Sequence, residues 1–270
     1  MKRFFILAYG LSAYVFTLWT ILYLTGFVTG IVVPRTIDEA PLQSGPWAWG
    51  INIGLIGIFA VQHMIMAREG FKVRLRKLIP AAAERSTFVL ITCLILNLIF
   101  LQWRAMPYVV WSIDSPTLTW CLRALSLSGW GLVLLATFLI NHFELFGVEQ
   151  VWKNFRNSKP VAKRFMTPSL YRLTRHPMYL GFFIAFWTTP SMSLGHLLFA
   201  GLFTAWVLFE IVMFEEPDLV KDFGIKYRRY QATVRMILPI PVRRDQNATV
   251  ASECSGWSCE GSSQTMNTLD

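Results

Sequence analysis

The chain has 270 residues, of which 54% are hydrophobic and 15% are charged, and its formal net charge is +9 at pH 7. So few charged residues beside so much apolar length exclude an ordinary water-soluble globular domain and predict a membrane protein. The 25 lysines and arginines are divided among several loops without a recognisable binding module, so no nucleic-acid partner is expected.

Five long apolar segments can each cross a bilayer, which takes about 20 apolar residues. They are residues 4–33, 47–66, 86–103, 120–143 and 194–214. A sixth segment, residues 179–192, is shorter and contains Pro190, which predicts a tilted or half-buried helix. We therefore predict an all-α integral membrane protein with six crossings, five of them long and one short.

The positions of the basic residues predict the orientation of these crossings. Two precede the first segment, six lie within 68–85, seven within 153–175 and seven within 221–244, which leaves three for the other loops. Lysine and arginine concentrate in cytoplasmic loops of membrane proteins. Both termini and all the basic loops are therefore expected in the cytoplasm.

The composition changes near the C-terminus. Residues 1–242 form one predicted membrane domain, whereas residues 243–270 are rich in serine, threonine, asparagine and glycine and predict a disordered cytoplasmic tail. Cys254 and Cys259 lie in this tail at a spacing that does not match the common zinc pattern, and the four histidines are scattered. No metal site is expected.

A polar turn precedes the short apolar segment. Pro177 suits the first turn of a helix, whose free amides face an anion, and Arg175 adds a fixed positive charge. His176 and Tyr179 are three residues apart and share a helix face, while Gly181 lets a ligand or a neighbouring helix approach. This pattern favours a ligand that carries a carboxylate. The alternative is that these residues only cap and pack an interfacial helix.

A second polar cluster follows the last apolar segment. Glu215 and Glu216 leave the membrane together, where an unpaired carboxylate is unfavourable unless a cation or water compensates it. A ligand with an ammonium, a sulfonium or ribose hydroxyls would supply partners, and so would Arg175, Arg228 or Arg229. Both explanations stay open at this stage.

Together the two clusters resemble the cofactor-binding half of the isoprenylcysteine carboxyl methyltransferase and phospholipid methyltransferase superfamily. The resemblance covers about residues 171–230, within a predicted cofactor half of about residues 165–239, and implies that S-adenosyl-L-methionine is the cofactor. It also implies which residues surround that cofactor: Tyr171, Arg175, His176, Pro177, Tyr179, Gly181, Glu215, Glu216, Tyr227 and Tyr230. Tyr227 and Tyr230 would lie on a C-terminal helix that covers the cofactor.

More of the chain is similar to a narrower bacterial group, the methanethiol S-methyltransferases among the NnrU-like membrane proteins. The similar stretches include residues 62–72, 84–90, 141–147 and 185–200. This resemblance implies methylation of a small volatile thiol to dimethyl sulfide, at a cytoplasm-facing site in a bacterial inner membrane.

Two positions depart from the related enzymes. Ile211 and Val212 stand where prenylcysteine enzymes carry an arginine, and Pro217 stands where thiol enzymes tend to carry one.

A thiol must lose its proton to react well, so a base near the pocket is expected. His63 and His142, both at predicted cytoplasmic ends of crossings, are the candidates, although either can equally be a structural interfacial histidine.

Two other functions stay open: a nonenzymatic accessory protein of the NnrU type, and a methyltransferase for another thiol or a lipid. Cofactor binding separates the first of these from an enzyme, and the oligomeric state does not follow from the sequence.

Overall fold

The computed structural model describes residues 1–39, 45–158 and 165–240, so the predicted tail at 243–270 lies outside the described residues. Helices dominate it, which confirms the all-α prediction. The elements in chain order are α1 (Lys2–Thr29), α2 (Pro46–Ala67), α3 (Glu69–Leu75), η1 (Ala81–Ala83), α4 (Glu84–Gln102), β1 (Val109–Ser112), α5 (Pro116–Ile140), α6 (His142–Leu145), α7 (Val148–Phe155), η2 (Ser169–Arg172), α8 (Pro177–Trp187), β2 (Ser191–Ser193), α9 (Leu194–Glu210), η3 (Ile211–Glu215), α10 (Glu216–Phe223) and α11 (Ile225–Thr233).

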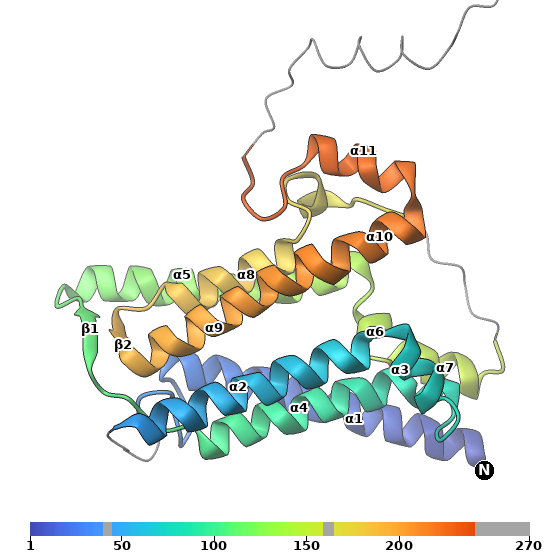
Figure 1. The fold of residues 1–270 in the computed structure, drawn as a ribbon, viewed down its shortest axis with the longest axis horizontal. Coiled ribbons are helices and arrows are strands. Elements are labelled where there is room, and N and C mark those ends of the chain that lie inside the picture. Colours follow the sequence, from blue (N-terminus) through green and yellow to red (C-terminus); the bar gives the residue numbers. More distant parts are fainter. Residues whose placement is uncertain (40–44, 159–164, 241–270) are drawn as a thin grey trace, which may run out of the picture.

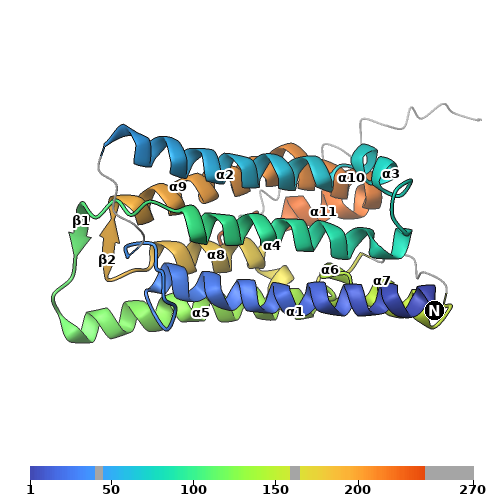
Figure 2. The same ribbon diagram turned by 90° about the horizontal axis from the view of Figure 1, so that it is seen from below.

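The long helices form two layers. Helices α1, α4 and α2 lie side by side in one layer, and α5, α8 and α9 lie in the other (Figures 1 and 2). Aromatic side chains fill the space between them: Phe27, Trp103 and Phe199 are all fully buried, with ring centroids 5.7 to 6.3 Å apart. Such burial is the main stabilising contribution within the bundle.

Each of the five long predicted crossings corresponds to a helical segment that is long and apolar enough to span a membrane. These segments are Lys2–Thr29, Pro46–Ala67, Ala81–Gln102, Pro116–Ile140 and Leu194–Phe223. The sixth, α8, has only 11 residues and therefore rises about 16 Å, roughly half of a hydrocarbon core. The protein is thus a multi-pass membrane protein in which one helix is too short to cross straight.

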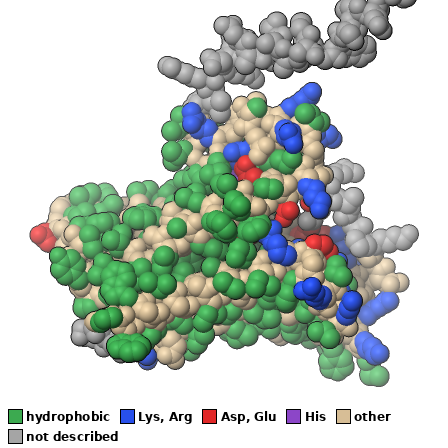
Figure 3. All heavy atoms as spheres, viewed as in Figure 1, with side chains coloured by type: hydrophobic (Ala, Val, Ile, Leu, Met, Phe, Trp, Pro, Cys, Tyr) green, Lys and Arg blue, Asp and Glu red, His purple; other side chains and the backbone are tan. Residues whose placement is uncertain are grey.

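The two ends of the bundle differ. At one end β1 pairs with β2 in a short antiparallel sheet, with Trp111 opposite Met192, an element that the sequence did not predict. At the other end lie the N-terminus, α3, α7, α10 and α11 (Figure 1). Figure 3 shows lysine and arginine side chains gathered toward this second end, while hydrophobic side chains cover most of the remaining face.

Two glycines let α5 and α8 approach closely. A Cβ added to Gly129 would lie 2.7 Å from the backbone nitrogen of Ala185, and one added to Gly181 would lie 2.7 Å from the carbonyl oxygen of Gly129. Small residues at such contacts are how membrane helices pack without side chains between them. This contact fixes α8, and with it the polar turn that precedes it.

The last long helix contains a π-helical turn, η3, just before the glutamate pair. The amide of Glu216 donates to the carbonyl of Ile211, five residues earlier. Pro217 follows immediately and has no amide to donate, so a wider turn here accommodates the missing helical bond. The proline that departs from the related thiol enzymes is therefore part of the local helix geometry that orients Glu215 and Glu216.

Candidate active site

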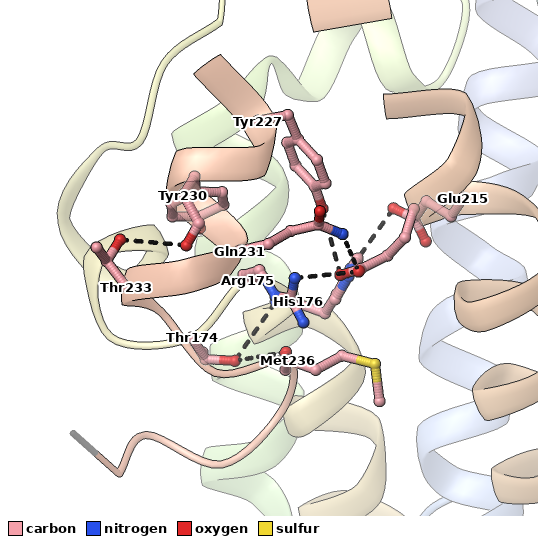
Figure 4. Close-up of polar contacts among 10 residues, drawn as sticks. Thr174, Arg175, His176, Glu215, Tyr227, Tyr230, Gln231, Thr233 and Met236 are labelled. Carbon is pink, nitrogen blue, oxygen red and sulfur yellow. Dashed lines mark hydrogen bonds and ion pairs between the residues drawn. The ribbon is translucent and has the colours of Figure 1, made fainter. Parts of the chain in front are cut away.

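The polar turn before α8 is held by the segment that follows α11. The amides of Arg175 and His176 donate to the carbonyls of Arg235 and Met236 at 3.0 and 3.1 Å, and the hydroxyl of Thr174 donates to Met236 at 3.0 Å (Figure 4). His176 is 5% exposed, and Pro177 begins the helix directly after it. The C-terminal segment thus clamps the turn in one conformation.

Glu216 is the centre of this clamp. Its two oxygens lie 3.0 Å from Nη1 of Arg175, 3.0 Å from Nε2 of His176, 2.6 Å from Nε2 of Gln231 and 3.3 Å from the hydroxyl of Tyr227. Its side chain is 12% exposed. A buried carboxylate is tolerated only with such a complete set of donors. Glu216 therefore ties together the polar turn, α10 and α11.

Glu215, the next residue along the chain, has a different environment. Its nearest ion-pair partner is Nδ1 of His176 at 3.6 Å. Within the described residues, its Oε2 atom is buried without a hydrogen-bond partner. An unsatisfied carboxylate oxygen in such a place is unfavourable. Of the two glutamates, Glu215 is the one with capacity left for a cationic ligand.

The two glutamates also determine the charge of His176. Burial alone lowers its pKa, but the hydrogen bonds and charges of Glu215 and Glu216 outweigh burial and raise the pKa above its ordinary value. The imidazolium form is thus stabilised at higher pH than in water. The turn presents two cations, Arg175 and His176, against two carboxylates.

Three tyrosines from two elements, η2 and α11, surround the cluster. Burial raises the pKa of Tyr171 and of Tyr227, and raises that of Tyr230 to about 12, so all three keep their protons as hydrogen-bond donors. Tyr230 donates to the carbonyl of Tyr171, whose own hydroxyl lies 3.4 Å from the carbonyl oxygen of Ala136. Helix α11 therefore covers the turn, and its cover of a cofactor stays a prediction.

The remaining predicted residues on α8 lie on different sides of that helix. The ring of Tyr179 lies 5.7 Å from that of His176 and belongs to the cluster. Gly181 instead packs on Gly129 of α5. The helix-packing alternative for Gly181 is therefore the one that its surroundings favour.

The structure separates the two histidines predicted as bases. Nε2 of His142 lies 2.8 Å from the hydroxyl of Tyr14, and its Nδ1 lies 2.8 Å from that of Thr137. Its ring stacks on Phe138 with centroids 4.1 Å apart, and burial lowers its pKa. Asn141 beside it caps α6, accepting a hydrogen bond from the amide of Glu144. His142 is therefore occupied on both nitrogens.

His63 faces the interior between the layers. Its ring lies 4.9 Å from Phe88 and 5.2 Å from Trp206. Its Nδ1 atom is buried and has no hydrogen-bond partner in the described part of the chain. Of the two predicted bases, only His63 keeps a ring nitrogen without a hydrogen-bond partner among the described residues.

Two arginines near this interior were not predicted as site residues. Arg68 pairs with Glu210 at 2.9 Å, and its guanidinium lies 3.9 Å from the ring centroid of Phe214. Arg85 lies at the start of α4. Arg68 directly follows one predicted crossing and Arg85 directly precedes the next, and a charge at that depth is itself a functional signal. Arg68 also brings a cation beside η3, where the sequence shows only Ile211 and Val212.

No group of three histidine, cysteine, aspartate or glutamate side chains within residues 1–39, 45–158 and 165–240 is arranged to hold a metal ion. Cys254 and Cys259 lie outside these residues, and a metal-free site stays a prediction.

The chain is similar to known proteins over most of its length. The model of the NnrU protein family matches residues 52–240. The chain is 46% identical to methanethiol S-methyltransferase 1 of Bradyrhizobium diazoefficiens over 88% of this chain and 83% of that protein. It is 48% identical to methanethiol S-methyltransferase of a Pseudomonas strain (86% and 89%) and 45% identical to that of Mycobacterium tuberculosis (90% and 99%). No solved structure matches. The narrower resemblance drawn from the sequence is confirmed.

Proposed function

The chain belongs to the NnrU protein family, and we propose that it is a membrane-bound methyltransferase that transfers a methyl group from S-adenosyl-L-methionine to methanethiol and so forms dimethyl sulfide. Similarity to the methanethiol S-methyltransferases extends over most of both chains, so it includes the bundle as well as the polar cluster. One observation inside the matched region carries the proposal. Glu216 is paired with several donors, whereas Glu215 has a buried oxygen without a hydrogen-bond partner among the described residues.

The proposed donor fits the groups that the site leaves free. When bound, S-adenosyl-L-methionine supplies a sulfonium methyl group, and the molecule also carries an ammonium and a carboxylate. The free Oε2 of Glu215 suits a cation. The first amides of α8 and the buried Nε of Arg175, which lacks a partner among the described residues, suit the carboxylate.

Different residues have different proposed tasks in the donor site. We assign contact with the donor to Arg175, His176, Pro177, Tyr179 and Glu215. Glu216 keeps the polar turn and α11 in place, because its oxygens are already occupied. The donor site is covered by side chains of the last helix and of η2: Tyr171, Tyr227 and Tyr230.

The acceptor is proposed to be a small thiol that enters a largely apolar interior. Thiolate and sulfonium lose their opposite charges as the methyl group moves, so a dry site that aligns the two favours transfer. His63 is the group available to take the thiol proton, since its Nδ1 has no other partner within the described chain. The rings of Phe59, Phe88 and Trp206 around it keep water away.

We further propose that the site faces the cytoplasm of a bacterial cell from the inner membrane. The polar cluster lies at the end of the bundle that holds α3, α7, α10 and α11, where lysine and arginine side chains gather (Figure 3). This is the charge asymmetry expected of cytoplasmic loops.

The direct test is chemical. Membranes that contain the full chain, supplied with S-adenosyl-L-methionine and methanethiol in a sealed vial, should release dimethyl sulfide and accumulate S-adenosylhomocysteine. The Glu215→Gln variant should lose most of this activity, whereas Asp222→Asn, the same change at an exposed position of α10, should keep it. Inserted protein that neither binds the cofactor nor makes dimethyl sulfide would favour the nonenzymatic accessory role.

A further inference from the structure

Arg85 is a cation in an unusual setting. Its Nε donates to the carbonyl of Leu145 at 2.7 Å, which fixes the guanidinium, and its Cζ lies 5.0 Å from the ring centroid of Phe88. The neighbouring Glu84 pairs with Arg76 instead. Across the described ranges no carboxylate forms an ion pair with Arg85. A half-buried arginine without a carboxylate partner is unfavourable unless an anion approaches it.

Phe88 brings this cation to the candidate base. The same ring that lies beside Arg85 lies 4.9 Å from the ring of His63. Phe59 and Trp206 close the other sides of His63, with ring centroids 5.7 and 5.2 Å away. We call this group of His63, Phe59, Phe88, Trp206 and Arg85 the aromatic recess. It combines aromatic side chains, one base nitrogen without a partner among the described residues, and one cation.

Helix α9 connects the aromatic recess with the proposed donor site. Trp206 of α9 contacts His63, Glu210 at the end of α9 pairs with Arg68, and Glu215 follows in η3. Arg85 approaches the recess from α4 through the ring of Phe88. A small molecule beside His63 would therefore lie along the same helix that carries the glutamate assigned to the donor.

We propose that the aromatic recess is the acceptor subsite for a small alkyl thiol, and that Arg85 stabilises the thiolate formed there. The inference rests on the proposed function and adds where the thiol binds and which residue stabilises its charge. The side chains of the recess are aromatic, and the cation of Arg85 would attract the sulfur only after the proton has left. A neutral thioether product has no such attraction, so it can leave toward the bilayer.

The proposed step balances in atoms and charge. The S–H bond of the thiol breaks and its proton goes to Nδ1 of His63. A sulfur lone pair then forms the new S–CH3 bond, while the bond from that methyl group to the donor sulfonium breaks and its electron pair stays with the donor sulfur. The products are a thioether and neutral-sulfur S-adenosylhomocysteine, and His63 later returns its proton to water.

The role of the Arg85 charge can be tested by substitution. Arg85→Met keeps the length and removes the charge, Arg85→Lys keeps the charge, and Arg74→Met is the control, since Arg74 is exposed on α3. A cation a few ångströms away lowers an acid's pKa by about 1 to 3 units, so Arg85→Met should reduce kcat/KM for methanethiol at neutral pH by about tenfold or more. Arg85→Lys should recover much of this, and S-adenosyl-L-methionine affinity should stay near wild type in all three.

A second measurement separates thiolate stabilisation from packing. Ethanethiol and 2,2,2-trifluoroethanethiol share the same two-carbon chain, but the second is more acidic and ionises without much help. The defect of Arg85→Met should therefore shrink with the fluorinated thiol and as the pH rises. Equal loss on both thiols at every pH, or a variant as active as wild type, would overturn the role of Arg85. Wild-type protein that methylates neither these two thiols nor methanethiol would instead refute the proposed function.

Discussion

Nε2 of His176 lies 3.0 Å from Oε1 of Glu216, although 40 residues separate them along the chain. The contact joins the turn before α8 to the start of α10, and Arg175 reinforces it from the same turn. Because Glu216 is used in this way, the adjacent Glu215 remains available. Two glutamates that are equivalent in the sequence are thus expected to respond differently to substitution.

Glu216→Gln should destabilise the protein more than Glu215→Gln does. Removing the Glu216 charge leaves Arg175 buried without its carboxylate and His176 with only Glu215, at 3.6 Å, which costs about 3 kcal/mol. Glu215→Gln removes one charged contact to a ligand and should weaken S-adenosyl-L-methionine binding by roughly tenfold or more. Thermal unfolding in detergent and cofactor titration measure the two effects, with Asp222→Asn as control. Equal melting temperatures for both variants would contradict the division of tasks.

The stability of the polar turn should depend on pH through His176. The two glutamates raise its folded-state pKa above the ordinary value of 6.5, so the stabilisation is complete below 6.5 and is lost as pH rises through the raised value. His176→Gln lacks this contribution. The difference in melting temperature between wild type and His176→Gln should therefore shrink between about pH 6 and pH 9. A difference that grows over this range would show that folding lowers the pKa of His176 instead of raising it.

Gly181→Ala should disturb the α5–α8 contact, because its new methyl group would lie 2.7 Å from the carbonyl oxygen of Gly129. Overpacking of this kind costs about 1 to 3 kcal/mol and would displace α8 with the turn it carries. Gly131→Ala on α5 is the matched control, since nothing lies within 4 Å of its added Cβ. Thermal unfolding of both variants checks the prediction, and equal destabilisation would point to a general effect of alanine on α5 and α8.

His63→Ala should lose turnover by about 10² to 10⁴-fold while cofactor binding persists, because the thiol proton loses its acceptor. His142→Ala should instead lower stability, since it breaks the contacts with Tyr14 and Thr137, and should keep turnover per folded molecule. Headspace dimethyl sulfide and melting temperature, measured on the same preparations, distinguish the two. Raising the pH should partly restore His63→Ala, and the opposite pattern of losses would exchange their roles.

The orientation can be tested by labelling single cysteines with an impermeant reagent. Ser158 follows α7 at the basic end of the bundle, and Ser115 precedes α5 at the end with β1 and β2. Ser158→Cys should react only when the reagent reaches the cytoplasmic side, and Ser115→Cys only from the opposite side. Labelling of both from one side would show that the two ends do not lie across a membrane.

The sequence by itself determined the membrane class, the long helices and the short segment near 179–192, because hydrophobic length is a local property of the chain. It also indicated the residues at Arg175–Tyr179 and at Glu215–Glu216, since their turn and helix positions are local too. It did not indicate the β1–β2 pair, whose strands lie about 80 residues apart in a chain that otherwise reads as helix.

The tertiary structure decided how these residues are used. Whether Glu215 or Glu216 is free depends on Gln231 and Tyr227, which α11 brings back to the turn. Arg68 meets Glu210 across 142 residues of chain, and the ring of Phe88 reaches His63 only because α2 and α4 pack in one layer. The availability of a charge depends on which partners surround it, and in this protein those partners come from distant helices.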